Sequence, residues 1–284
     1  MSAFPEEEIR MLLPLQDTGG LICMSKIKKA FENGKAFIAF VTAGDPNLEA
    51  SEKIIREVAR GGADLIEIGI PFSDPIAEGP VIQNASVRAL SAGTTTDRVF
   101  ELVKKIRKDI DLPMVFMTYT NLVYSYGKEA FFAHCRELSM DGIILPDLPY
   151  EEKEELHDAA KAEGIDLISM IAPTSEDRIT RIAKEAEGFL YVVSSLGVTG
   201  VRSEIKTDLK SILEVVRTAT DLPAAVGFGI STQEQAKKIS AYSDGVIVGS
   251  AIVKLIEAYG EEAAPYVYEY VKGMKDAVTS QETE

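Results

Sequence analysis

The chain alternates eight times between a short apolar run and a longer stretch with helical periodicity. The short runs, rich in aliphatic and β-branched residues, lie at 36–41, 64–69, 113–118, 142–146, 166–171, 189–194, 223–229 and 244–249. Between them, stretches such as 48–62, 96–110 and 175–188 carry apolar residues three and four positions apart. This alternation predicts parallel strands joined by helices, because parallel neighbours require a long crossover connection.

Eight strand and helix pairs favour an α/β fold of the closed (β/α)₈ type, the TIM barrel. A doubly wound open sheet is the alternative that the pattern leaves open. The 284 residues, 46% of them hydrophobic, suffice for one barrel with a large core. We therefore expect a single catalytic barrel over residues 24–284.

The first 23 residues differ in character from the rest, and Met24 begins a segment that reads as an independent start. We treat residues 1–23 as an N-terminal extension. Its apolar cluster from Met11 to Leu15 could dock on the barrel, but an upstream start is the simpler account. The chain has neither the pattern of a secretory signal nor a long apolar segment, so we expect a cytoplasmic protein without a membrane span.

The charge balance excludes several kinds of partner. The chain has 30 Lys and Arg against 45 Asp and Glu, a formal net charge of −15. We therefore expect no binding to nucleic acid or to an anionic membrane. The two cysteines, Cys23 and Cys135, and the two histidines, His134 and His157, form no disulfide framework or metal-ligand pattern.

Glu67 stands out in the second predicted strand. Alternation places it on the face opposite Ile66 and Ile68. The side of a barrel strand that faces the helices is apolar, so Glu67 is predicted to point into the barrel at its C-terminal end. Burial there would raise its pKa and suit it to proton transfer. A structural glutamate bonded to a tyrosine is the alternative.

Two connections from a strand to the next helix are unusually long, at 70–95 and 195–207, and long ordered loops on this face of a barrel commonly carry function. The first contains Asp74 and Glu78 between prolines that stiffen the backbone. One of these carboxylates is a candidate second acid or base, although each could instead serve only solubility.

Glycines cluster after the last three predicted strands, at 197–200, at 227–231 and at Gly249, which precedes Ser250. Glycine lets the backbone approach a ligand closely, and N–H groups at the start of a helix bind an anion without a lysine. Barrels often bind phosphate at the loops after strands 7 and 8. The three clusters predict a phosphate pocket that an acidic protein can provide.

Seven segments together carry a resemblance to a known family. They are AFVTAGDP (39–46), LIEIGIPFSDP (65–75), GPVIQNAS (79–86), YTNLVY (119–124), GVTG (197–200), GFGIS (227–231) and GSAIVK (249–254). With them the chain resembles the tryptophan synthase α subunit family from about residue 26 to residue 259.

The resemblance implies a lyase of tryptophan biosynthesis that splits indole-3-glycerol phosphate, by retro-aldol cleavage, into indole and glyceraldehyde 3-phosphate. It implies that Glu67 is the principal acid–base carboxylate and Glu78 the second. The implied substrate-binding residues are Phe40, Tyr119 and Tyr191 around indole, Thr199 at the mouth, and Gly200, Gly229, Gly249 and Ser250 around phosphate.

The same resemblance implies a β subunit as partner, in an α₂β₂ heterotetramer, with Asp74 and Pro75 in the loop that faces it. It implies no metal and no cofactor in this chain, because pyridoxal phosphate belongs to the β subunit. Two positions depart from the family pattern: Glu78 replaces an aspartate, and the segment at Ser195 lacks an arginine that many relatives carry.

Three other functions stay open from the sequence. The first is a free-standing indole-3-glycerol-phosphate lyase, and the second is a non-catalytic subunit that regulates its β partner. The third is another phosphate-binding barrel, such as a sugar-phosphate epimerase.

Overall fold

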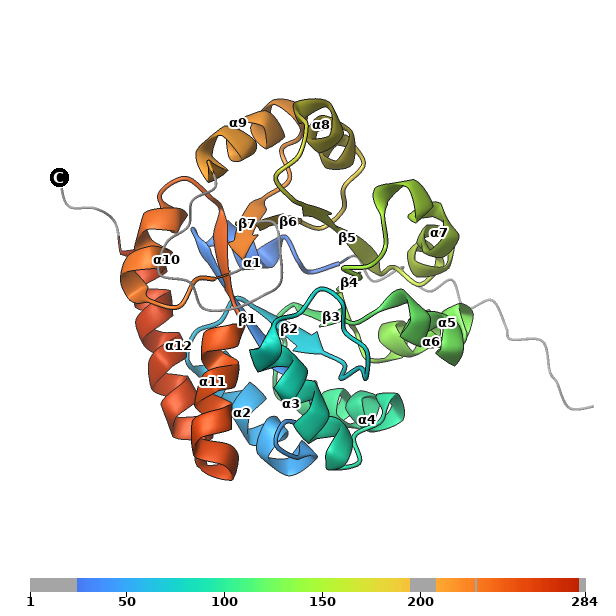
Figure 1. Cartoon of the computed structure of the whole chain (residues 1–284), viewed down its shortest axis with the longest axis vertical. Helices are drawn as coiled ribbons and strands as arrows, with labels where there is room; N and C mark the ends of the chain where they lie inside the picture. The colour runs from blue at the N-terminus through green and yellow to red at the C-terminus, as the bar shows by residue number, and fades with distance from the viewer. Residues whose placement is uncertain (1–24, 195–207, 228, 281–284) are drawn as a thin grey trace, which may run out of the picture.

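The strands close into a parallel barrel in the order β1 to β8, with β8 paired to β1 (Figure 1). The computed structural model describes residues 25–194, 208–227 and 229–280. The strands are β1 (Ala36–Thr42), β2 (Leu65–Gly69), β3 (Met114–Met117), β4 (Gly142–Ile144), β5 (Asp166–Ile171), β6 (Leu190–Val193), β7 (Ala224–Gly227) and β8 (Gly245–Val248). The predicted barrel is confirmed and the open sheet is excluded.

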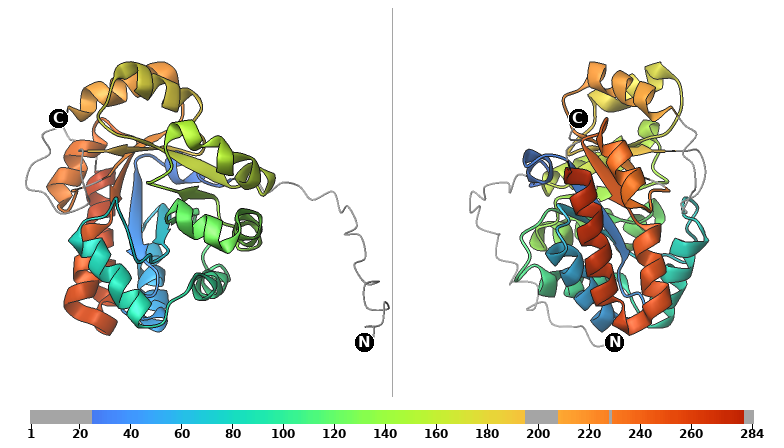
Figure 2. Two further views of the ribbon diagram at one scale, coloured as in Figure 1. Left: turned by 45° about the vertical axis from the view of Figure 1, so that its right-hand side comes forward. Right: turned by 90° about the vertical axis from the view of Figure 1, so that its left-hand side faces the viewer.

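Helices surround the barrel, as Figure 1 shows. They are α1 (Lys29–Glu32), α2 (Leu48–Arg60), α3 (Pro80–Ser91), α4 (Thr96–Ile106), α5 (Thr120–Tyr126), α6 (Lys128–Glu137), η1 (Tyr150–Glu152), α7 (Glu154–Ala162), α8 (Glu176–Lys184), α9 (Leu209–Ala219), α10 (Gln233–Ser240), α11 (Ser250–Tyr259), η2 (Gly260–Glu262) and α12 (Ala264–Thr279). The views in Figure 2 show α12 lying along the outside of the barrel, where it packs against α2 and α10.

The connection predicted over 70–95 is wrong in part, because it contains the 12-residue helix α3. Gly79 is the N-cap in an extended conformation, and Pro80 takes the first helical position, where its missing N–H costs nothing. Ile82 and Ala89 lie on the buried face of the helix. The loop that remains before the helix, 70–79, is therefore shorter than predicted and ends directly at a helix N-terminus.

Side chains of the strands form two apolar layers. Ile66 and Ile68 pack in the outer layer between strands and helices, whereas Leu65 packs with Phe40 inside the barrel. Because side chains alternate along a strand, Glu67 shares the inner face with Leu65. The predicted inward orientation of Glu67 is confirmed.

Four acidic side chains at the N-terminal ends of the strands link neighbouring strands by hydrogen bonds. Each lies shortly before an even-numbered strand and accepts the N–H of a residue at the start of the preceding odd-numbered strand. The bonds are Phe37 N to Asp64 (2.7 Å), Met114 N to Asp141 (3.0 Å), Leu167 N to Glu187 (3.2 Å) and Ala224 N to Asp244 (2.9 Å).

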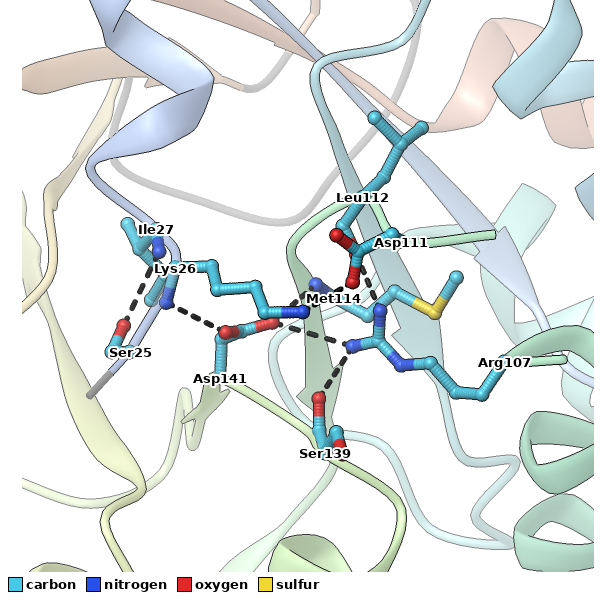
Figure 3. A network of polar contacts seen from close by, with 9 residues as sticks. All are labelled: Ser25, Lys26, Ile27, Arg107, Asp111, Leu112, Met114, Ser139 and Asp141. Carbon is cyan, nitrogen blue, oxygen red and sulfur yellow. Dashed lines mark hydrogen bonds and ion pairs between the residues drawn. The ribbon is translucent and has the colours of Figure 1, made fainter. Parts of the chain in front are cut away.

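The bond network at Asp141 also attaches the N-terminal segment to the barrel (Figure 3). Its Oδ1 accepts the backbone N–H of Lys26 at 2.7 Å, and its Oδ2 lies 3.3 Å from the guanidinium of Arg107. Ile27, the next residue, is fully buried. This segment closes the N-terminal end of the barrel, so access to its interior is from the other end.

Candidate active site

One pocket at the C-terminal ends of the strands collects most of the predicted site residues. It is lined by Phe40, Glu67, Glu78, Ile82, Met117, Tyr191, Gly229, Ile230, Ile247, Gly249 and Ser250. Of the other predicted residues, Tyr119 lies beside this pocket, whereas Thr199 and Gly200 lie outside the described residues. Both carboxylates, two aromatic rings and two of the predicted phosphate-binding glycines, Gly229 and Gly249, thus meet at one place.

Glu67 is only 1% exposed, and its Oε2 has no hydrogen-bond partner in the described part of the chain. Burial, with a smaller contribution from the charge of Glu78, raises the pKa of Glu67 to about 8. At neutral pH the carboxyl group is therefore mostly protonated. A protonated carboxyl that faces an apolar pocket is suited to donate a proton.

Glu78 is also buried, at 7% exposure, and it lies just before the N-cap of α3. Burial raises the pKa of Glu78 to about 7, although a hydrogen bond from the Tyr119 hydroxyl lowers it. The same hydroxyl oxygen accepts the backbone N–H of Ala77 at 3.1 Å. Tyr119 thus holds both the backbone beside Glu78 and its carboxylate. Sequence reasoning placed Tyr119 in the ring pocket and missed this contact.

Two aromatic side chains lie directly against glycines of neighbouring strands. A Cβ on Gly69 would lie 2.7 Å from Cζ of Phe40, and a Cβ on Gly227 would lie 2.6 Å from the hydroxyl oxygen of Tyr191. Real Cβ atoms do not approach other atoms so closely, so any side chain at either glycine would displace the ring. Sequence reasoning missed Gly69, whose only signal was its place on the inner face of β2.

The opposite end of the pocket is made of backbone. Gly249 is the N-cap of the ten-residue helix α11, and Ser250 is its first residue. The first N–H groups of a helix have no partner within it and carry partial positive charge. Gly229 has φ +87°, a conformation that favours glycine. This end can bind an anionic group, although no Lys or Arg lies among the described pocket residues.

The pocket that both carboxylates line is narrow, about 30 Å³. A larger cavity of about 440 Å³ lies over β4 and β5, and it is lined by Ala77, next to Glu78. We place the chemistry in the narrow pocket, because it alone holds the buried carboxylates with raised pKa values. The larger cavity gives the mouth of the barrel additional room.

A family model described as tryptophan synthase alpha chain matches residues 25–279. The chain belongs to the tryptophan synthase alpha chain family. The alpha chain of Lactiplantibacillus plantarum is 50% identical over 256 residues, which are 90% of this chain and 97% of that relative.

Two solved structures extend the comparison with this family. The tryptophan synthase alpha chain of Legionella pneumophila has a TM-score of 0.83 at 34% identity, over 92% of this chain and all of that one. A chain of the tryptophan synthase α₂β₂ complex of Pyrococcus furiosus has a TM-score of 0.78 at 34% identity, over 85% of this chain and 99% of that one.

Family membership confirms the expected role as the alpha subunit of tryptophan synthase, and with it the expected lyase activity in tryptophan biosynthesis. Within the described residues, no group of three or more His, Cys, Asp and Glu could hold a metal ion. No described helix is long and apolar enough to cross a membrane. The roles of the individual site residues stay predictions.

Proposed function

We propose that this tryptophan synthase alpha chain cleaves indole-3-glycerol phosphate with Glu67 and Glu78, and passes indole to a β subunit. The observation that carries the proposal is the meeting of two buried carboxylates with the N-terminus of α11 in one pocket. The pocket thus offers a proton donor, a second carboxylate and an anion site to one substrate.

Glu67 performs the proton transfers. Its protonated carboxyl donates a proton to C3 of the indole ring, which becomes iminium-like. The carboxylate that results takes the proton of the hydroxyl on the adjacent glycerol carbon. The bond between that carbon and C3 then breaks, its electrons restore the indole ring, and the hydroxyl carbon becomes the aldehyde of glyceraldehyde 3-phosphate.

Glu78 stabilises the positive charge that develops on the ring. As an anion it accepts a hydrogen bond from the ring N–H. In a pocket shielded from water, the loss of one such contact raises the activation free energy by about 2.7–4 kcal/mol. The Tyr119 hydroxyl, bonded to Ala77 N, sets the position of the longer glutamate side chain. Phe40, Tyr119 and Tyr191 surround the ring.

Phosphate binds at the other end of the pocket, to the N-terminus of α11 at Gly249 and Ser250 and to the turn at Gly229. Thr199 and Gly200, which the family resemblance adds to the substrate site, belong to a segment outside the described residues. In this proposal the alpha chain itself needs neither metal nor cofactor, and pyridoxal phosphate belongs to the β subunit.

The partner is a tryptophan synthase β subunit, in an α₂β₂ assembly like that of the Pyrococcus furiosus complex. The loop at Asp74 and Pro75 faces it. Ile76, in the same loop, is 74% exposed, and a partner surface would cover this apolar side chain. Residues 24–284 form the catalytic barrel of the proposal, and residues 1–23 are an extension without a part in it.

The test is indole release from indole-3-glycerol phosphate by the full chain, with and without a β subunit. We expect slow release by the chain alone and faster release with β. Fast release that β does not change would indicate a free-standing lyase. No release in either mixture would indicate a regulatory subunit, and binding of a sugar phosphate without indole release would indicate another kind of phosphate-binding barrel.

A further inference from the structure

The fifth strand is packed less completely than the others. Every residue of the other seven strands is buried, whereas Asp166, Ser169 and Met170 of β5 are half-buried. Ser169 lies on the face toward the helices, between the apolar residues Leu167 and Ile171. A small polar side chain stands where a large apolar one would fill the layer, so space remains behind β5.

The helices on either side of β5 leave this space uncovered. α7 packs against α6, and α8 packs against α9. Within the described residues, α7 and α8 do not pack against each other in the same way. In Figure 1, α8 lies at the top of the view and α7 at the right, both outside β5. Both helices contact β5, but within the described residues α7 and α8 do not pack closely on each other over the strand.

The 440 Å³ cavity occupies this space. It is lined by Ile168 and Met170 on the inner face of β5 and by Leu167 and Ser169 on the outer face. β4 pairs with β5 only as far as Ile168, so among the described residues Ser169 and Met170 have no strand partner on that side, and the cavity reaches both faces of β5 there. Ala77, next to Glu78, lines it as well. The space behind β5 is thus continuous with the mouth of the active site.

The chemistry of this space favours a neutral ligand over an anion. Its two cationic side chains already have partners: Arg178 makes bonds of 2.5 and 2.9 Å to Glu151, and Lys153 Nζ donates to the backbone oxygen of Glu185 at 2.9 Å. Much of the wall is apolar, with leucine, isoleucine and proline side chains. Ser169 Oγ makes no hydrogen bond within the described residues, so it is available to accept one.

We propose that the part of this cavity behind β5, between η1 and α8, is a second binding site for indole. We call it the β5 compartment. An apolar cavity of about 150 Å³ is enough to bind benzene, and the whole cavity to which the compartment belongs, about 440 Å³, has room for a bicyclic ring. Ser169 Oγ accepts the ring N–H, and Leu167 and Ile182 contact its faces. The proposal rests on the proposed function in one respect, since that reaction supplies the indole.

The test counts the indole molecules bound per chain by equilibrium dialysis. Saturating indole-3-propanol phosphate occupies the substrate pocket; without the glycerol hydroxyls it cannot be cleaved. Under this block the full chain should still bind one indole. Ser169→Phe fills the compartment and should weaken that binding by about tenfold or more, whereas Ser169→Ala, the matched control, keeps the cavity and should retain most of it.

A wild-type chain that binds no indole under the block would overturn the proposal, and so would a Ser169→Phe variant that binds indole like its parent. Ser169→Leu serves if the phenylalanine variant does not fold, as judged by its melting temperature. Indole release by the same preparations separates the two ideas. If the chain releases indole but shows no Ser169-dependent indole binding, only the β5 compartment is refuted. If the chain shows that binding but releases no indole, only the proposed function is refuted.

Discussion

The negative charge of Glu78 raises the pKa of Glu67, in addition to the larger effect of burial. The pKa of Glu78 itself is about 7 and that of Glu67 about 8. At a pH between these two pKa values the two carboxyls together hold one proton, which lies mainly on Glu67. This is the protonation state that the proposed reaction requires, with one carboxyl as donor and the other as anion.

The rate of indole release should depend on pH through both carboxyls. kcat/KM for indole release should be highest between pH 7 and 8, the pKa values of the two carboxyls. It should fall at lower pH because Glu78 takes up a proton, and at higher pH because Glu67 loses one. A pH series of initial rates checks this, and a rate that stays level through both pKa values would contradict it.

Tyr119→Phe is the control for this assignment. It removes the hydrogen bond that lowers the pKa of Glu78, so the acidic limb of the profile should move to higher pH. An acidic limb that stays in place would mean that Glu78 does not produce it.

Substitutions at Glu78 test whether the longer side chain still serves as the second carboxylate. Glu78→Ala should lower turnover by about 10²-fold or more, the size of one lost electrostatic contact. Glu78→Asp keeps the charge and should stay within about tenfold of wild type. Indole release by the three proteins decides it: an alanine variant as active as its parent removes Glu78 from the mechanism, and an aspartate variant that gains activity absent from the parent points to a regulatory subunit.

Gly229→Val should strongly weaken binding of phosphate compounds. Gly229 has φ +87°, which a β-branched residue hardly adopts, and a side chain would crowd the anion. Calorimetric titration with glyceraldehyde 3-phosphate and inorganic phosphate measures the loss. Binding as tight as in the wild type would show that the phosphate site lies elsewhere.

A chain that begins at Met24 should fold as well as the full chain, because the predicted barrel is complete without residues 1–23. Its melting temperature is the measurement. A decrease of more than about 5 °C would show that the Met11 to Leu15 cluster stabilises the barrel.

Much of the fold follows from local pattern. Eight apolar runs predicted the eight strands to within a few residues at their ends, and alternation in β2 predicted the inward face of Glu67. Such features depend on neighbours in sequence, so the sequence alone reveals them. Helix α3 was missed because prolines and acidic residues before it resemble a continuing loop, although Gly79 and Pro80 are a usual helix start.

Other features depend on residues that are far apart in the chain. The bond of Tyr119 to Ala77 joins positions 42 residues apart, and the close approach of Phe40 to Gly69 joins two strands. The cavity at β5 likewise joins residues of β4, η1, β5 and α8. No pattern of neighbouring residues encodes such contacts, and only the folded chain reveals them.

Glu67→Gln keeps the size of the side chain but removes the proton donor. The folded chain holds the Glu67 proton up to about pH 8, whereas an unfolded chain loses it near the ordinary value of 4.5. Stability of the wild type therefore falls as pH rises between these values. Glutamine has no proton to lose, so the stability of the variant does not fall with pH in this way. Above the Glu67 pKa the melting temperature of the variant should be at least that of the wild type, and this result would show that its fold is intact.

The most direct test is the rate of indole release from indole-3-glycerol phosphate by Glu67→Gln and by the wild type, both with a β subunit present. Acid–base catalysis by a positioned side chain contributes about 10²-fold or more, so the variant should be slower by at least that factor. A variant within about threefold of the wild type would contradict the central role of Glu67.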